Sequence, residues 1–280
     1  MTNNIFFFCV QGSLVNITNR DKLDIESKSY ILINSFRKYH NDKIIAMIPD
    51  YVKNTDYDIS IKTKKFYNDN NIDIIYFNNP LLNENTIKNK QILLFNKIYA
   101  FKYINLLYID LLKNKDKFIF CDTDLYFNEK LIITEDILNS NFAAVLSDTE
   151  DGYNDKLIEK YKLNLTLKRY LSLNHNFEFK FPYFNSGLFI FNINNELSDL
   201  WINYSDDLLK CNDKDIYPLE EQIALSIAIN KTSNINLLIL DRKYNYSIHI
   251  LKEDSQDSKI IHYHNENLQN YNNMYPKTIY

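Results

Sequence analysis

Short apolar runs alternate along the first half of the chain with segments of helical spacing, and this alternation limits the possible folds more than any other feature. Four apolar runs have the length of β-strands and lie at residues 5–11, 43–49, 73–77 and 117–122. Between them, residues 27–40 and 91–113 repeat apolar side chains at helical intervals. Strands that alternate with helices favour a mainly parallel sheet with helices on both faces, so the pattern predicts an α/β fold.

The second half of the chain continues this pattern. Four more strands are predicted, the second entered through a turn, within residues 142–147, 181–192, 236–241 and 259–264. Helical spacing predicts three more helices near residues 155–173, 195–210 and 218–230. Neither an internal repeat nor a linker rich in Pro, Gly or Ser interrupts the chain, so we expect one continuous domain of 280 residues.

The charge balance and the glycine content exclude several functions. The formal net charge is −4, which gives no general basic surface, and we expect no nucleic-acid partner. The three glycines, Gly12, Gly152 and Gly187, lie far apart. The phosphate-binding loops GxxxxGK[ST] and GxGxxG are therefore impossible. If the chain binds a phosphorylated ligand, a metal and side chains must hold the phosphates.

Cysteine usage and the apolar segments favour a cytoplasmic protein. Cys9, Cys121 and Cys211 are odd in number and lack the spacing of a zinc site, which suits a reducing compartment. The N-terminal apolar run is too short for a membrane span, and no basic region or cleavage site accompanies it. Residues 270–280 combine Tyr, Met and Lys, so a peripheral membrane contact stays open beside a solvated tail.

Two aspartates stand where the pattern otherwise predicts a buried strand. In the stretch FIFCDTDLYF, Asp122 and Asp124 flank a threonine between apolar residues. An isolated carboxylate in an apolar site is costly, so it normally acquires a partner, a proton or a metal. Because ligands of parallel sheets bind beyond the carboxyl ends of the strands, this position favours a functional site.

A D-x-D pair of this kind supports two chemistries. Its carboxylates can bind a divalent cation that neutralises a diphosphate. Alternatively, the first aspartate is a nucleophile and the second an acid, as in phosphatases of the haloacid dehalogenase type. A second copy, Asp213 and Asp215, has polar flanks and no preceding strand, so we interpret it as a solvated loop.

Polar residues elsewhere could complete a site around the first pair. The tripeptide Asn185–Gly187 comes just before a predicted strand, where backbone and amide groups can approach a sugar closely. Glu221 and Gln222 begin a predicted helix. His262 ends another apolar strand, where it is positioned to be a third metal ligand.

Together these segments resemble the metal-dependent GT-A-fold glycosyltransferases, most closely family 8, the glycogenin and lipopolysaccharide galactosyltransferase-like group. That family has, in order, an N-terminal strand, a strand ending in D-x-D, a [FY]-N-[SA]-G strand, a D-Q pair on a helix and a late strand ending in H-[FY]. The chain has IFFFCVQ, FIFCDTD, YFNSG, EQ and IIHY in the same order. The resemblance implies a GT-A (Rossmann-like) domain with a nucleotide-binding half, 1–125, and a sugar and acceptor half, 126–280.

The resemblance also implies roles for individual residues. Three would hold Mn²⁺ or Mg²⁺, namely Asp122, Asp124 and His262. Eight would contact the nucleotide-sugar donor, namely Gln11, Lys97, Asp122, Thr123, Asp124, Asn185, Ser186 and Gly187. Glu221 and Gln222 would face the sugar and the acceptor as the catalytic pair.

The implied reaction moves a hexose from a UDP-sugar to an acceptor hydroxyl with retention, by attack on the same face. The acceptor would be a glycan, a lipid-linked molecule or a protein. The chain departs from the family pattern at two places: Glu221 replaces an aspartate, and HYHNENLQNYNN stands where the family has G-x-K-P-W after the histidine. Stabilisation of the leaving group would then come from the metal, from His264 or from another residue.

Two other functions stay open. A phosphatase of the haloacid dehalogenase type would leave YFNSG and IIHY unexplained, and Tyr126 stands where that class usually has Thr or Val. A catalytically inactive module that binds sugar nucleotides would account for the missing lysine. Structural roles also stay open for single residues, with Lys97 as a solvated helix lysine and His262 as a histidine of the core or surface.

Overall fold

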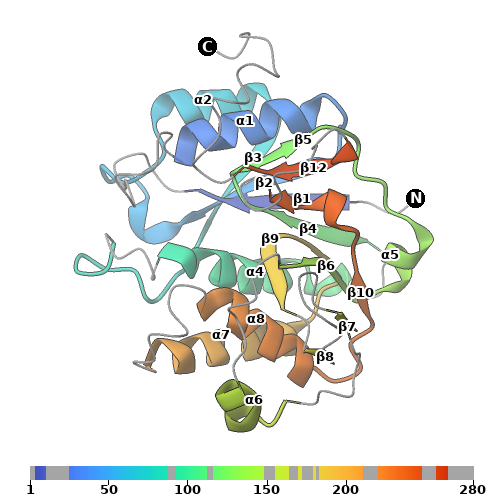
Figure 1. Ribbon diagram of the computed structural model, residues 1–280. Helices are drawn as coiled ribbons and strands as arrows, with labels where there is room; N and C mark the ends of the chain where they lie inside the picture. The colour runs from blue at the N-terminus through green and yellow to red at the C-terminus, as the bar shows by residue number, and fades with distance from the viewer. Residues whose placement is uncertain are drawn as a thin grey trace.

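A seven-stranded sheet forms the centre of the computed structural model (Figure 1). The order of its strands is β10-β6-β9-β4-β1-β2-β3. Their bounds are β1 Asn4–Cys9, β2 Lys43–Pro49, β3 Ile72–Phe77, β4 Lys117–Cys121, β6 Phe142–Leu146, β9 Phe184–Phe191 and β10 Leu237–Ile239. β9 runs antiparallel to its neighbours β4 and β6, and the other pairings in this sheet are parallel. The predicted α/β fold with a mainly parallel sheet is confirmed.

The structure describes the chain in ten stretches. These are residues 4–10, 25–87, 93–111, 116–147, 155–163, 170–171, 179–180, 183–210, 220–247 and 257–263. Several residues singled out from the sequence lie outside them, namely Gln11, Gly12, Gly152, Cys211, Asp213, Asp215, His264 and 270–280. Within the ten stretches, no helix combines the length and the apolar character needed to cross a membrane.

Helices cover both faces of the central sheet (Figure 1). One face packs against α1 Ile25–Arg37, α2 Ile61–Asp69 and the short α5 Glu135–Asn139. The other face packs against α4 Asn96–Leu107, α6 Asp155–Tyr161, α7 Asn195–Lys210 and α8 Glu220–Lys231. The sheet therefore separates two hydrophobic cores, as the sequence pattern predicts.

The side chains of β1 show why its apolar run is continuous. Phe6 and Phe8 belong to the core under α1 and α2, whereas Phe7 belongs to the core on the opposite face. All three rings are at most 1% exposed. Burying each one contributes roughly 1.5–3 kcal/mol to stability. A strand covered on both faces needs an apolar residue at every position.

The described residues also form two smaller sheets. The first contains β5 Leu125–Phe127, β11 Tyr246–Ser247 and β12 Ile260–His262, with β12 antiparallel to β5 and parallel to β11. The second pairs β7 Tyr170–Leu171 with β8 Phe179–Lys180. Three short 3₁₀ turns lie at Asp50–Val52, Ile109–Leu111 and Arg242–Tyr244. The strand predicted at 259–264 is present, but it belongs to the first small sheet, which the sequence does not predict.

Two predicted helices are too long. The helix predicted over 91–113 ends at Leu107 and is followed by a 3₁₀ turn. The helix predicted near 155–173 ends at Tyr161 because Lys162 takes a left-handed φ of 47°. The Lys162 N–H bonds to the Glu159 carbonyl at 3.1 Å, which closes the last turn.

A buried histidine ties the turn after α1 to the loop after β5. His40 Nε2 accepts a hydrogen bond of 3.0 Å from the Leu131 N–H, and Nδ1 lies 3.0 Å from Asp42. Because Nε2 accepts, Nδ1 carries the proton and donates to Asp42, so the ring is neutral. Burial lowers the pKa of His40, an effect opposed by Asp42 and reinforced by Lys130 and Arg37. A proton on Nε2 would remove the acceptor for Leu131.

We predict that His40→Phe lowers the free energy of unfolding at pH 7.5 by about 1–3 kcal/mol, because the Leu131 N–H loses its acceptor. The difference from the wild type should shrink as pH falls below about 6.5, the ordinary pKa of His. Below that pH, His40 binds a proton more readily in the unfolded wild type than in the folded one, which favours unfolding. The variant has no imidazole at this position, so only the wild type is destabilised in this way. Urea unfolding in EDTA at pH 7.5, 6.5 and 5.5 measures the difference. A difference that does not change with pH would show that His40 has the same pKa in the folded and the unfolded protein.

Candidate active site

The D-x-D pair occupies a turn at the carboxyl end of β4. The strand is buried throughout and ends at Cys121, and Asp122, Thr123 and Asp124 are half-buried. The Leu125 N–H reaches the Asp122 carbonyl at 3.3 Å, and the chain then continues as β5. This is the position at which an α/β sheet binds its ligands.

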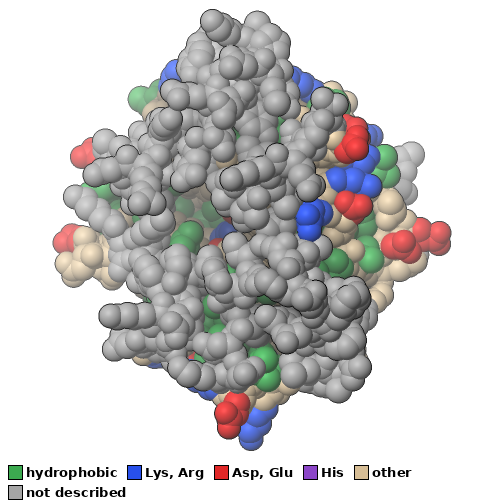
Figure 2. Space-filling model, in the orientation of Figure 1, with side chains coloured by type: hydrophobic (Ala, Val, Ile, Leu, Met, Phe, Trp, Pro, Cys, Tyr) green, Lys and Arg blue, Asp and Glu red, His purple; other side chains and the backbone are tan. Residues whose placement is uncertain are grey.

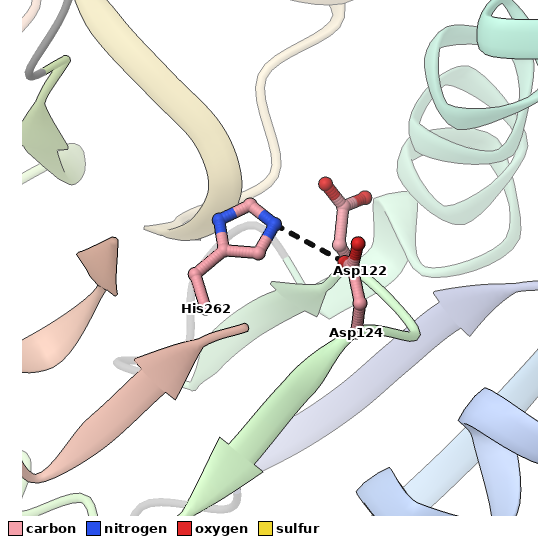
Figure 3. A group of neighbouring side chains, drawn as sticks. All are labelled: Asp122, Asp124 and His262. Atoms are coloured by element: carbon pink, nitrogen blue, oxygen red, sulfur yellow. Dashed lines mark hydrogen bonds and ion pairs between the residues drawn. The ribbon is translucent and has the colours of Figure 1, made fainter. Parts of the chain in front are cut away.

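His262 reaches this turn from the opposite end of the sequence. β12 pairs antiparallel with β5, and the register places His262 opposite Leu125. The Tyr263 N–H then donates to the Asp124 carbonyl at 3.1 Å. As Figure 3 shows, the imidazole points toward the two aspartates, with Nε2 lying 3.1 Å from Asp124 Oδ1.

The chemistry of this group suits a divalent cation. Asp122, Asp124 and His262 each offer one ligand atom, and these atoms lie within 4.8 Å of one another. Among the described residues, no other group of three His, Cys, Asp or Glu side chains meets this condition. Carboxylate oxygens suit Mg²⁺ and Mn²⁺, and imidazole nitrogen suits transition metals. The residues that the sequence predicts as metal ligands are therefore brought together.

Lys97 is buried at the centre of the site. It lies in the first turn of α4 and is 7% exposed. Its Nζ is 3.1 Å from the Asp122 carboxylate, 3.0 Å from Ser186 Oγ and 3.4 Å from Glu221 Oε1. A solvated position for Lys97, which the sequence leaves open, is wrong.

Burial and the neighbouring charges together set the protonation of Lys97 and Asp122. Burial lowers the pKa of Lys97, but Asp122 and Glu221 more than offset this, so the pKa lies above its ordinary value and the ammonium is charged. Burial raises the pKa of Asp122 to about 6, although Lys97 opposes the shift. The site therefore favours a cation beside Asp122.

The tripeptide Asn185–Gly187 and the start of α8 lie on the other side of Lys97. The tripeptide lies inside β9, which begins at Phe184, so its predicted place before the strand is wrong. Ser186 Oγ donates to the Glu221 carboxylate at 3.1 Å. Glu221 is buried in the first turn of α8, where the helix dipole favours a negative charge.

Trp201 is a supporting residue that the sequence does not reveal. Its ring is fully buried in α7, and its Nε1–H donates to the Glu221 carbonyl at 2.8 Å. This bond fixes the first turn of α8 from behind the site. The apolar stripe of α7 predicts a buried tryptophan, but no local signal indicates its contact with Glu221.

Gln222 and Asn185 complete the described part of the site. The Gln222 side chain is half-buried, and its Oε1 accepts no hydrogen bond within the structure described. Asn185 Oδ1 accepts the Gly187 N–H at 2.9 Å. Two residues with predicted roles at the site, Gln11 and His264, lie outside the described stretches.

We predict that Lys97→Met lowers the stability of the metal-free protein. Asp122 and Glu221 would lose the ammonium that compensates them, and breaking a buried ion pair in this way costs on the order of 3–5 kcal/mol. Chemical unfolding in EDTA measures the loss. Lys102→Met is the matched control, because Lys102 lies on the same helix and pairs with the exposed Asp199; its loss should stay below about 1 kcal/mol. Equal losses in the two variants would contradict the central position of Lys97.

Solved glycosyltransferase structures share this fold. Galactosyltransferase LgtC, in complex with donor and acceptor sugar analogues, is similar over 93% of this chain and 87% of its own, with a TM-score of 0.50 and 14% identity. An active-site mutant of LgtC has a TM-score of 0.52 and 13% identity over the same shares. The apo bifunctional glycosyltransferase WbbM matches 94% of this chain with a TM-score of 0.51 and 14% identity, and the matched region spans 45% of WbbM.

Sequence comparison identifies the family. No curated protein matches the chain. The Rhodobacterales glycosyltransferase domain matches residues 15–233, which include the D-x-D pair, Asn185–Gly187 and Glu221 but not His262. Membership of family 8 stays a prediction. Because the match covers well over half of the chain, the protein belongs to the Rhodobacterales glycosyltransferase domain family.

Proposed function

We propose that this chain transfers a hexose from a UDP-sugar to an acceptor hydroxyl, with Mn²⁺ or Mg²⁺ held by Asp122, Asp124 and His262. The observation that carries the proposal is the convergence of these three side chains at the carboxyl end of β4. Membership of a glycosyltransferase family supports the reaction class. LgtC, a galactosyltransferase whose structure holds donor and acceptor sugar analogues, supports the choice of substrates.

The proposed cation site provides what the sequence lacks for diphosphate binding. Three widely separated glycines cannot form a phosphate-binding loop, so the phosphates need charged side chains and a metal. A divalent cation would neutralise the negative charge that develops on the departing diphosphate. Lys97 contributes to the same site by holding Asp122 in place.

The other polar side chains face the sugar in this proposal. Gln222 Oε1 is buried and accepts no hydrogen bond from the described residues, so it can accept one from a sugar hydroxyl. Asn185 and Ser186 offer further polar groups along β9. Glu221 positions Lys97 and Ser186 through its carboxylate. Because these contacts occupy the Glu221 carboxylate, it is a poor nucleophile.

The reaction breaks the bond between the anomeric carbon and the phosphate oxygen and forms a bond from the same carbon to the acceptor oxygen. The acceptor proton leaves with UDP. With Gln222 rather than a free carboxylate beside the sugar, a covalent intermediate has no suitable nucleophile. We therefore propose attack on the same face, which retains the anomeric configuration.

The acceptor is proposed from the family resemblance, and the compartment from the sequence. The acceptor is proposed to be a glycan, a lipid-linked molecule or a protein, and the reaction is proposed to take place in the cytoplasm. Contact of residues 270–280 with a membrane surface stays a prediction. At the right-hand edge of Figure 2, basic and acidic side chains of the described residues lie side by side rather than in a basic patch. That the chain has no nucleic-acid partner stays a prediction.

We predict that UDP binding requires the cation and Asp124. Calorimetry should show tight UDP binding with Mn²⁺ and a large loss in EDTA. Asp124→Asn keeps the size of the side chain but removes a charge, so we expect at least about a 10–100-fold loss of affinity for UDP with Mn²⁺ and loss of UDP-sugar turnover.

Asp73→Asn is the control. Asp73 lies on β3, where its exposed carboxylate pairs with Lys43, so this substitution should leave UDP binding unchanged. Equal UDP affinity in EDTA and Mn²⁺ would contradict the metal-dependent donor site. Hydrolysis of a phosphomonoester without consumption of UDP-sugar would favour the phosphatase instead. Metal-dependent binding of UDP-sugar without release of UDP would favour an inactive binding module.

A further inference from the structure

Gly187 lies next to two of the proposed cation ligands, Asp122 and His262. Its carbonyl accepts the Asp122 N–H at 2.7 Å, and its own N–H donates to Asn185 Oδ1 at 2.9 Å. The residue is buried inside β9. Its backbone is therefore held on both sides, next to the first aspartate of the D-x-D pair.

Backbone conformation does not explain a glycine here. Gly187 does not have a positive φ, so an ordinary residue could adopt the same backbone. A glycine in the interior of a strand weakens the strand, because it has no side chain to pack and loses more entropy on folding. A glycine at this position needs another reason.

The reason is the space occupied by the His262 ring. A Cβ on Gly187 would lie 2.4 Å from His262 Cε1, 2.7 Å from its Nδ1 and 3.0 Å from Asn185 Oδ1, and the two contacts with the ring are too short unless the ring moves. In Figure 3 the yellow strand β9 passes beside this ring. The ring is 4% exposed, and its strand is fixed by pairing with β5 and by the bond from Tyr263 to Asp124. A side chain at residue 187 would displace the imidazole.

We propose that Gly187 is a positioning residue of the cation site, acting through His262 rather than through a contact with the sugar. The missing side chain leaves the space in which the imidazole lies, and this lets Nε2 approach Asp124. The inference rests on the cation site of the proposed function. It changes the role that the family resemblance implies for Gly187, which is contact with the donor.

A double-mutant cycle tests the inference with Mn²⁺ alone, without nucleotide. The variants are Gly187→Ala, His262→Ala and the double variant, and calorimetry measures the Mn²⁺ affinity of each. We expect either single change to weaken binding by at least about 10–100-fold. The double variant should bind no more weakly than His262→Ala, because the added methyl group then has no ring to displace.

Thermal unfolding in EDTA gives a second readout that does not depend on metal. Gly187→Ala should lower the melting temperature, and adding His262→Ala should restore part of the loss by removing the clash. Additive losses in both measurements, or normal Mn²⁺ affinity in Gly187→Ala, would overturn the inference. If the wild type binds no Mn²⁺, the cation site itself fails, and the inference fails with it. If Gly187→Ala does not fold, recovery of the folded double variant supports the clash, and failure of both contradicts it.

Discussion

The antiparallel placement of β9 beside β4 is the constraint on which the site depends. The register sets Leu188 opposite Cys121, and the Asp122 N–H bonds to the Gly187 carbonyl at 2.7 Å immediately beyond this pair. The amino-terminal end of β9 therefore meets the carboxyl end of β4. A parallel β9 would place its carboxyl end there instead, and Asn185–Gly187 would lie at the far edge of the sheet.

Excess negative charge is the second feature that organises the site. Asp122, Asp124 and Glu221 gather around a single described ammonium, that of Lys97, and all are at least partly buried. Three carboxylates carry more negative charge than one ammonium can balance, and a divalent cation would compensate the excess. The Lys97 ammonium contacts both Asp122 and Glu221, and the His262 imidazole contacts Asp124. One continuous set of contacts thus links α4, β4, β9, α8 and β12.

Sequence patterns predict the parts of this arrangement that depend on local periodicity. The runs of β1 and β4 are apolar throughout because both faces of the sheet are covered, so their strands could be located. The burial of Lys97 could not be predicted, because a lysine near the start of a helix is solvated unless distant carboxylates surround it. The contact of Trp201 with Glu221 and the separate sheet of β12 likewise depend on tertiary packing. The early end of α6 depends on a left-handed lysine, which no turn residue signals.

The proposed cation site requires His262 to bind the metal together with the two aspartates. Electron spin echo envelope modulation of Mn²⁺ added to the protein detects a nitrogen ligand directly. We expect nitrogen modulation from one imidazole in the wild type and its disappearance in His262→Ala. Bound Mn²⁺ without nitrogen modulation in the wild type, or modulation that persists in His262→Ala, would contradict the account.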